Sequence, residues 1–207
     1  MTQETDNGRV RAAVRKLVAE RVGRHWCLFL DRDGVINQRV VGDYVRSWEQ
    51  FVWMPGARDA MWILRQWAPH LVVVTNQQGV GKGLMSLNDV TAIHDRIQDD
   101  LSVNDSVVEE FLICPHLESE ECGCRKPRPG LVADWLRGHA DSEPSLSIIV
   151  GDRTSDLELA RNVAAATGGC TTVHITGGGP AEAADVCVSS LMEFAVEVTQ
   201  ARKDVLG

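Results

Sequence analysis

Short apolar runs alternate with amphipathic stretches along this chain from residue 26 onward. The runs are brief and rich in Val, Ile and Leu, which predicts buried strands at 27–30, 71–75, 111–114, 147–150, 171–176 and 185–188. Between them, apolar residues recur at helical spacing, which predicts helices at 55–67, 86–101, 129–139, 155–166 and 190–203. Strands separated by helices indicate right-handed crossovers. We therefore expect an α/β fold, a Rossmann-like parallel sheet with helices on both faces.

The first residues follow a different pattern. Residues 1–24 are polar and locally basic, with a weak apolar stripe that predicts an amphipathic surface helix or a loose arm. The expected organisation is an N-terminal extension at 1–25 and one domain at 26–207. Within that domain, Ser86 and Asp89 form a candidate capping box at the start of the second predicted helix.

Composition narrows the possible function classes. The chain has 207 residues and is 44% hydrophobic, which is enough for one sizeable core. A net charge of −8 argues against an extended nucleic-acid surface. The apolar runs are too short to span a membrane, and none resembles a signal peptide. We expect a cytoplasmic monomer that acts on a small molecule, without nucleic-acid or membrane partners.

Polar residues gather where the predicted strands end. In open α/β sheets, ligands bind beyond the carboxyl ends of the strands. Four ends carry chemistry here: LDRDG with Asp31 and Asp33, TNQQ beginning at Thr75, a cysteine-rich loop leading to Arg125 and Lys126, and GDRTSD with Asp152 and Asp156. The topology brings all four to one crevice, where Asp156 either supports the site or favours the first turn of its helix.

These residue types suit phosphoryl transfer. Asp31, Asp33 and Asp152 offer the oxygen ligands that Mg²⁺ prefers. Asp31 can attack phosphorus as a nucleophile, while Asp33 protonates the leaving oxygen and later activates water. The Thr75 hydroxyl and the Lys126 ammonium can hold the remaining phosphoryl oxygens.

The cysteine-rich loop suggests a second metal. Cys114, His116, Cys122 and Cys124 supply a Cys3His set, which is typical of structural zinc, although free thiols in a surface loop are the alternative. All four positions would be filled, so we expect this zinc to fix Arg125 and Lys126 over the crevice rather than to perform chemistry.

In that order, the motifs DRDGVIN, VVVTNQ, CRKP and GDRTSD resemble the four motifs of haloacid dehalogenase superfamily phosphatases. The pattern C-x-H followed by C-x-C-R-K-P is similar to the branch that contains histidinol-phosphatases and D,D-heptose 1,7-bisphosphate phosphatases. The resemblance spans about residues 26–176. It implies Mg²⁺ dependence, an aspartyl-phosphate intermediate and a minimal cap made of loops.

Within that branch the substrate stays open. The short zinc loop is similar to the histidinol-phosphatase form, whereas GDYV, TNQQGVGKG and SLNDV resemble the heptose enzymes. We favour removal of the 7-phosphate of D-glycero-D-manno-heptose 1,7-bisphosphate, with a histidinol-phosphate phosphatase or a polynucleotide 3′-phosphatase-like enzyme as alternatives. The candidate substrate contacts are Gly42, Asp43, Tyr44, Asn76, Gln77, Gln78 and Arg125.

Two other features receive no role. GVGKG at 79–83 fails the P-loop pattern and is expected to be a flexible loop. Five histidines lack a coherent set of partners in the sequence and are assigned no chemistry: His25, His70, His94, His139 and His174.

Overall fold

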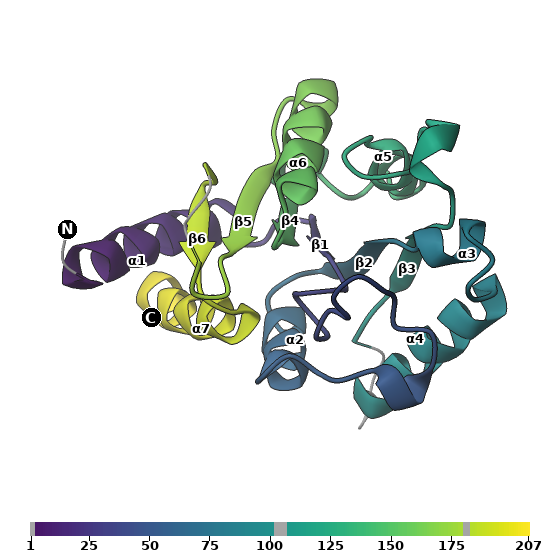
Figure 1. Ribbon diagram of the computed structural model, residues 1–207. Coiled ribbons are helices and arrows are strands. Elements are labelled where there is room, and N and C mark those ends of the chain that lie inside the picture. Colours follow the sequence, from purple (N-terminus) through teal and green to yellow (C-terminus); the bar gives the residue numbers. More distant parts are fainter. Residues whose placement is uncertain (1–2, 102–106, 180–182) are drawn as a thin grey trace.

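Six parallel strands form the centre of the molecule in the order β3-β2-β1-β4-β5-β6 (Figure 1). The computed structural model describes residues 3–101, 107–179 and 183–207. The strands are β1 Cys27–Leu30, β2 His70–Asn76, β3 Glu110–Cys114, β4 Ile148–Gly151, β5 Thr171–Ile175 and β6 Val186–Val188. The predicted α/β sheet is confirmed, and each predicted strand is present with its ends shifted by a residue or so.

The sheet has helices on both faces, which explains its apolar strands. Along β1, Leu28 and Leu30 join the larger core cluster, while Cys27 and Phe29 join the smaller one on the opposite face. Because successive side chains of a strand point to opposite faces, both faces need apolar residues. All four residues of β1 are buried.

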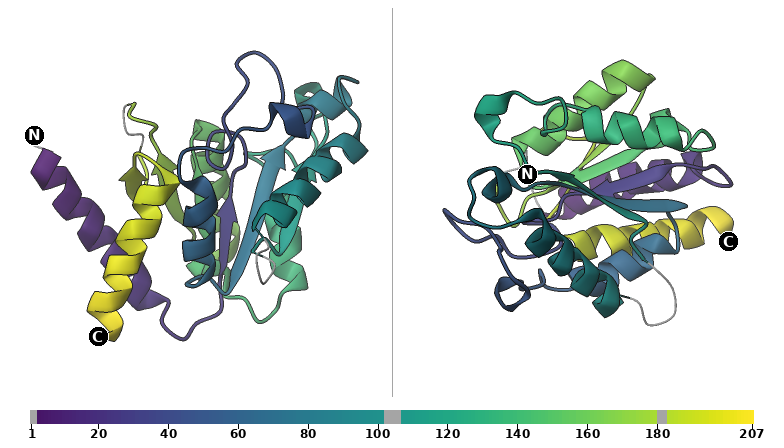
Figure 2. Two further views of the ribbon diagram at one scale, coloured as in Figure 1. Left: turned by 90° about the horizontal axis from the view of Figure 1, so that it is seen from below. Right: turned by 90° about the vertical axis from the view of Figure 1, so that its right-hand side faces the viewer.

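Figure 2 shows the two helical layers. Helices α5 Gly130–Gly138 and α6 Thr154–Thr167 cover the smaller cluster. The larger cluster is packed beneath α1 Gln3–Glu20, α2 Ala57–Arg65, α4 Leu87–Leu101 and α7 Leu191–Leu206. The short helical turns are η1 Trp48–Gln50, α3 Gln78–Gly81, η2 Glu118–Glu120 and η3 Pro144–Leu146. Among the helices that the structure describes, none combines the length and apolar character that crossing a membrane requires.

The predicted capping box of α4 is confirmed. The main-chain N–H of Asp89 donates to the Ser86 hydroxyl at 3.1 Å, and the main-chain N–H of Ser86 donates to the Asp89 carboxylate at 2.7 Å. These two bonds satisfy main-chain donors that the first turn of a helix would otherwise leave without partners.

The N-terminal segment forms the predicted helix but is not a loose arm. Val14 and Val18 of α1 are buried in the larger core cluster, and Arg11 lies 3.5 Å from Glu197 of α7. The two helices lie side by side in Figures 1 and 2. The domain boundary at residue 25 stays a prediction, but α1 and the sheet share one core.

The segment GVGKG is helical at its start rather than an irregular loop. Helix α3 covers Gln78–Gly81, and the N–H of Lys82 donates to the carbonyl of Gln78 at 3.0 Å. A Cβ atom on Gly81 would lie 2.8 Å from the carbonyl oxygen of Pro115. Glycine therefore lets α3 pack directly against the cysteine-rich loop, and this contact was not evident from the sequence.

Candidate active site

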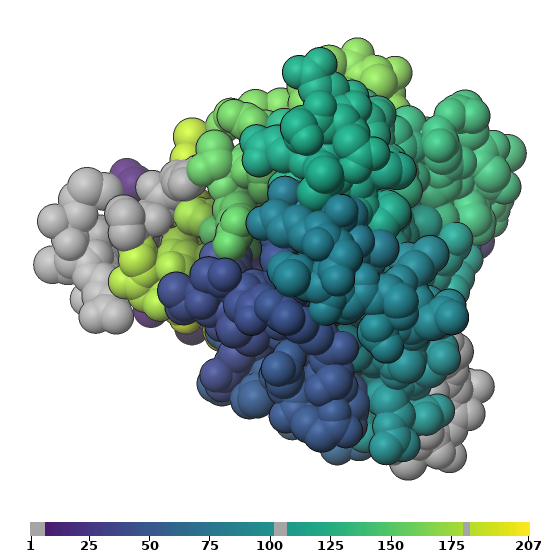
Figure 3. Space-filling view, turned by 45° about the vertical axis from the view of Figure 1, so that its right-hand side comes forward, coloured from purple at the N-terminus to yellow at the C-terminus, as the bar shows by residue number. Residues whose placement is uncertain are grey.

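The carboxyl edge of the sheet carries a cavity of about 760 Å³. Its walls are the segment after β1, the turn around α3 and the loop after β3, whose blue and teal surfaces adjoin one another in Figure 3. Ten of the predicted site residues line it: Asp31, Asp33, Gly42, Asp43, Tyr44, Thr75, Asn76, Gln78, Arg125 and Lys126. The topology thus brings most of the predicted residues to one place.

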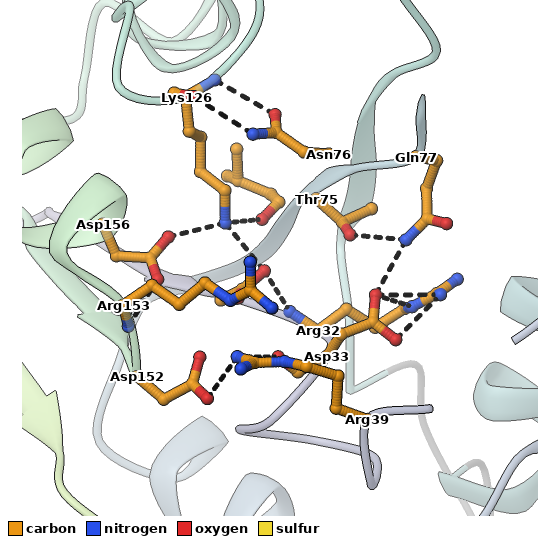
Figure 4. Close-up of polar contacts among 12 residues, drawn as sticks. Arg32, Asp33, Arg39, Thr75, Asn76, Gln77, Lys126, Asp152, Arg153 and Asp156 are labelled. Atoms are coloured by element: carbon orange, nitrogen blue, oxygen red, sulfur yellow. Dashed lines mark hydrogen bonds and ion pairs between the residues drawn. The ribbon is translucent and has the colours of Figure 1, made fainter. Parts of the chain in front are cut away.

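Lys126 lies at the centre of the charged groups (Figure 4). Its Nζ is 2.7 Å from Asp31 Oδ1, 2.7 Å from Asp156 Oδ1, and donates to the carbonyl of Val74 at 2.9 Å. Burial alone disfavours the ammonium, but the Asp156 and Asp31 carboxylates outweigh it and raise the pKa of Lys126 above its ordinary value. Lys126 is therefore a fixed positive charge beside Asp31.

Asp31 begins where β1 ends. Its main-chain N–H donates to the carbonyl of Val150 at 2.9 Å, which extends the pairing of β1 with β4 by one residue. Its Oδ1 accepts the main-chain N–H of Arg32 at 2.7 Å. Burial raises the pKa of Asp31 to about 7, with the Lys126 charge acting in the opposite direction. The Lys126 charge therefore favours the ionised carboxylate that nucleophilic attack needs.

Asp33 points away from Asp31 into a set of donors. Its carboxylate accepts two bonds from the fully buried Arg32 guanidinium at 3.2 and 3.1 Å, and one each from Asn37 and Gln77 at 2.9 Å. Burial alone would raise the pKa of Asp33, but Arg32 and the two amides outweigh it and lower the pKa. Asp33 is therefore held ionised in a fixed orientation.

Three carboxylates, two of them among the predicted magnesium ligands, lie close enough together to hold a divalent cation. Asp31, Asp152 and Asp156 each offer a carboxylate oxygen within 4.8 Å of one another, and the Asp33 carboxylate lies outside this group. Arg32 turns the Asp33 side chain away, so Asp33 as a metal residue stays a prediction that only its main-chain oxygen could fulfil here. Its main-chain oxygen faces Arg39, which donates to it at 3.1 Å.

Asp152 has one free acceptor in this site. Its Oδ2 pairs with Arg39, and its buried Oδ1 has no hydrogen-bond partner among the described residues. Burial raises the pKa of Asp152, while Arg39 opposes that shift. A Cβ atom on Gly34, whose φ is +103°, would lie 2.0 Å from Asp152 Oδ2. Only glycine allows the DRDG turn to approach this carboxylate.

Asp156 has both of the roles that the sequence left open. Its Oδ2 accepts the main-chain N–H of Arg153 at 3.2 Å, which satisfies a donor at the start of α6. Its Oδ1 lies 2.7 Å from Lys126 Nζ. Both oxygens of Asp156 therefore have partners, whereas the contacts of Asp31 and Asp152 given above involve one oxygen each, so these two are the better candidates for direct metal ligands.

The residues after β2 position the site from the side. Thr75 is buried, and its hydroxyl accepts a bond from Gln77 Nε2 at 2.8 Å. Asn76 exchanges two bonds with the main chain of Lys126, at 3.0 and 3.1 Å. Gln77 is fully buried and does not line the cavity. Its predicted substrate contact therefore does not fit, and its side chain instead orients Thr75 and Asp33.

The segment after the DRDG turn forms a small cover over the cavity. Asp43 pairs with Arg46 and accepts the main-chain N–H of Tyr44 at 2.9 Å. The Lys82 ammonium lies 5.4 Å from the centre of the Tyr44 ring, which joins this cover to the turn after α3. The arrangement agrees with the minimal cap of loops that the motifs imply.

The sequence analysis assigns no role to several residues of this site. Arg39, Lys82, Glu118 and Arg153 also line the cavity. Arg32 was missed although it stands between the two aspartates of DRDG. Its position offered a signal, because an arginine beside a buried carboxylate pair needs a partner of its own.

The four zinc-type ligands of the cysteine-rich loop come together. Each offers one atom, and these atoms lie within 4.8 Å of one another. Cys114 and Cys124 have their sulfurs 3.4 Å apart, and Cys124 lies 3.1 Å from His116 Nδ1. Tetrahedral zinc with bonds of about 2.3 Å to sulfur places two sulfurs about 3.8 Å apart, so Cys114, His116, Cys122 and Cys124 fit such an ion.

No protein-family model matches this chain, but individual proteins do. A D-glycero-alpha-D-manno-heptose-1,7-bisphosphate 7-phosphatase of Mycobacterium bovis is 62% identical over 186 residues, covering 90% of this chain and 98% of the relative. A D-glycero-beta-D-manno-heptose-1,7-bisphosphate 7-phosphatase of Neisseria meningitidis is 32% identical over 152 residues, covering 73% of this chain and 78% of the relative.

A solved structure is also similar to this chain. The crystal structure of D,D-heptose 1,7-bisphosphate phosphatase from B. bronchiseptica, complexed with magnesium and phosphate, superposes with a TM-score of 0.73 at 30% identity. The match covers 84% of this chain and 98% of that chain.

Proposed function

The chain belongs to the haloacid dehalogenase superfamily, in the family of heptose-1,7-bisphosphate 7-phosphatases, and from this premise we propose that it removes the 7-phosphate of D-glycero-α-D-manno-heptose 1,7-bisphosphate. The observation that supports this most directly is the Asp31–Lys126 pair at 2.7 Å, on the floor of a cavity lined by further cations. The α anomer is proposed because relatives at 61–62% identity are named for it.

Asp31 is the proposed nucleophile. Its carboxylate oxygen forms a bond to phosphorus while the bond from phosphorus to the sugar oxygen breaks, which leaves an aspartyl-phosphate. Lys126 and Thr75 neutralise and orient the phosphoryl oxygens. When bound, Mg²⁺ offsets the charge between carboxylate and phosphate, and Asp31 and Asp152 are the residues that would hold it.

Asp33 is the proposed acid and base. It gives a proton to the departing sugar oxygen, then takes one from the water that attacks phosphorus and releases phosphate. Arg32, Asn37 and Gln77 favour its ionised form, which suits the second step. An anionic phosphate beside the carboxylate favours the protonated form that the first step needs.

The charge of the cavity supports a bisphosphate over histidinol phosphate. Besides Lys126, its walls include the cationic side chains Arg39, Lys82, Arg125 and Arg153. Arg125 Nη1 is buried without a hydrogen-bond partner in the described parts of the chain, as expected for a group that awaits an anion. The bisphosphate offers these cations two phosphate groups, whereas histidinol phosphate offers one.

The proposed cofactors are one Mg²⁺ for the chemistry and one structural Zn²⁺ in the cysteine-rich loop. The zinc would stabilise a loop that has few apolar contacts of its own and that leads into Arg125 and Lys126. A cytoplasmic location and a monomeric state remain predictions, which cell fractionation and analytical ultracentrifugation would test.

The deciding experiment compares substrates on the purified protein with Mg²⁺. Phosphate release is measured for the α and β anomers of the heptose 1,7-bisphosphate and for histidinol phosphate. We expect the highest kcat/KM for the α anomer and no release by Asp31→Asn. A higher kcat/KM for histidinol phosphate would overturn the proposed substrate, and equal values for both anomers would overturn the anomer preference.

A further inference from the structure

Three potential metal ligands meet at the edge of the sheet opposite the cavity. His25 lies between α1 and β1, His70 begins β2, and Asp141 follows α5. One ligand atom of each lies within 4.8 Å of the others. Strand β2 has 7 residues, and at about 3.3 Å per residue it separates His70 from Asn76 by about 20 Å. This group is therefore distinct from the catalytic centre and from the cysteine-rich loop.

The environment of His70 orients the ring for metal binding. Its Nδ1 lies 2.7 Å from the Glu109 carboxylate, which can only accept a hydrogen bond when ionised. Nδ1 therefore carries a ring proton, which leaves Nε2 as the ring nitrogen that can bind a metal. A carboxylate that holds the far nitrogen of a histidine in this way is the usual support of a metal-bound imidazole.

The second ring nitrogen of His70, Nε2, has no hydrogen-bond partner among the described residues. The atom is buried, and its charged neighbour is the Asp141 carboxylate at 3.9 Å. A metal ion between Nε2 and the Asp141 carboxylate would give this buried nitrogen a partner.

We propose that His25, His70 and Asp141 form a second transition-metal site that takes Zn²⁺ or a similar divalent ion. Two imidazoles and one carboxylate suit zinc, with water completing the coordination. Ligand bonds of about 2.1 Å would place these atoms about 3.4 Å apart, so the 3.9 Å separation needs only a small contraction. The preceding helix α5 ends at Gly138, and its C-terminal dipole favours a nearby cation.

Such an ion would connect three segments that are distant in the sequence. The segment between α1 and β1 already contacts the segment after α5. The N–H of Glu143 donates to the carbonyl of His25 at 2.8 Å, and Glu143 pairs with Arg24. Metal binding would add the start of β2 to this contact. The expected role of the ion is to hold α1 and the segment that follows it against the edge of the sheet where the strands begin.

The test uses Co²⁺ as the probe on protein whose cysteine-rich loop is loaded with zinc, in excess Mg²⁺. We expect the wild type to bind one Co²⁺ with a visible spectrum that lacks thiolate-to-metal charge transfer. Asp141→Asn, which changes an exposed side chain, should weaken binding at least tenfold. The control Asp134→Asn removes an exposed carboxylate of α5 that lies outside the group, and should bind like the wild type.

A second pair of variants tests the support of His70. Glu109→Gln should weaken Co²⁺ binding by about 10–100-fold, because an amide no longer fixes the tautomer. The neighbouring Glu110→Gln should have no effect. Absence of a Co²⁺ site in the wild type, equal affinity in Asp141→Asn, or equal affinity in Glu109→Gln would each overturn the proposal.

Discussion

Arg39, which lines the cavity, forms an ion pair with Asp152, and the same guanidinium nitrogen donates to the main-chain oxygen of Asp33 at 3.1 Å. A cation held by Asp152 and by that oxygen would have to displace this nitrogen. Arg39→Ala should therefore tighten Mg²⁺ binding by about fivefold, corresponding to about 1 kcal/mol for a partly exposed pair.

Isothermal titration with Mg²⁺ in the absence of substrate measures this directly and separates it from any loss of substrate affinity. Arg153→Ala is the matched control, because Arg153 lines the same cavity without an ion pair to Asp152 in the described structure. Weaker Mg²⁺ binding by Arg39→Ala would show that Arg39 supports the metal ligands instead.

Asp31→Asn should abolish turnover without unfolding the protein. An amide is a poor nucleophile and a poor metal ligand, and it keeps the size of the side chain. The loss of kcat should exceed the 10²–10⁴-fold that is typical of one acid–base group. Circular dichroism and thermal unfolding report whether the fold is kept, and a folded variant that retains about a hundredth of kcat would contradict the assignment.

Arg125→Ala and Lys126→Ala should differ in substrate dependence. Lys126 contacts Asp31, so its loss should reduce kcat/KM for every phosphate ester. Arg125 lines the cavity with a buried unpaired nitrogen, and arginine can bind a second phosphate or a diol through two hydrogen bonds. Arg125→Ala should therefore reduce kcat/KM for the bisphosphate more than for p-nitrophenyl phosphate, and equal losses would argue against this role.

Cys122→Ser should lose zinc and behave like Arg125→Ala rather than like Lys126→Ala. Removing one of four ligands loosens the loop, but Lys126 stays tied to Asn76 and to the carbonyl of Val74. Metal analysis and kcat/KM for the two substrates test this together. Cys170→Ser is the control, since Cys170 lies outside the ligand group. A uniform loss on both substrates would mean that the loop also positions Lys126.

His94 should make the protein less stable in acid. Burial, together with the nearby Arg32 charge, lowers the pKa of His94 to about 3 from an ordinary value of 6.5. The unfolded chain therefore binds a proton more readily than the folded one. The contribution is fully present above pH 6.5 and is lost as the pH falls toward 3.

The measurement is urea unfolding at several pH values. The wild type should lose up to about 1.4 kcal/mol of unfolding free energy per pH unit through this one group. His94→Gln has no such proton to bind, so its free energy should fall less steeply below pH 6.5. Parallel curves for the two proteins would contradict the prediction.

Much of this architecture could be predicted because local signals carry it. Strand β2 was expected at 71–75 and spans His70–Asn76, since an uninterrupted apolar run bounded by polar residues has few alternatives. The same logic placed Asp31, Thr75 and Asp152 at strand ends, where the parallel sheet brings them together. The order of the strands along the chain was enough to predict that these three residues lie at the same edge of the sheet.

What the sequence missed depends on side-chain direction and on distant partners. The DRDG motif predicts two carboxylates on different sides of the chain but not that the Arg32 guanidinium fixes Asp33 with two hydrogen bonds. The stripe on the first helix predicts a helix but not its packing against α7. His25 and His70 seemed to lack partners because those partners come from other segments, and only folding places Asp141 beside them.

The two bonds between Asn76 and Lys126 also bear on how such proteins can diversify. The Asn76 side chain donates to and accepts from the main chain of Lys126, as a neighbouring strand would. The end of the cysteine-rich loop is therefore bound to β2 whatever the conformation of the loop itself. Insertions or deletions between Leu117 and Cys122 can then reshape the entrance of the cavity while the ammonium stays in place. Substrate range and bond-breaking chemistry can thereby evolve at separate rates on this scaffold.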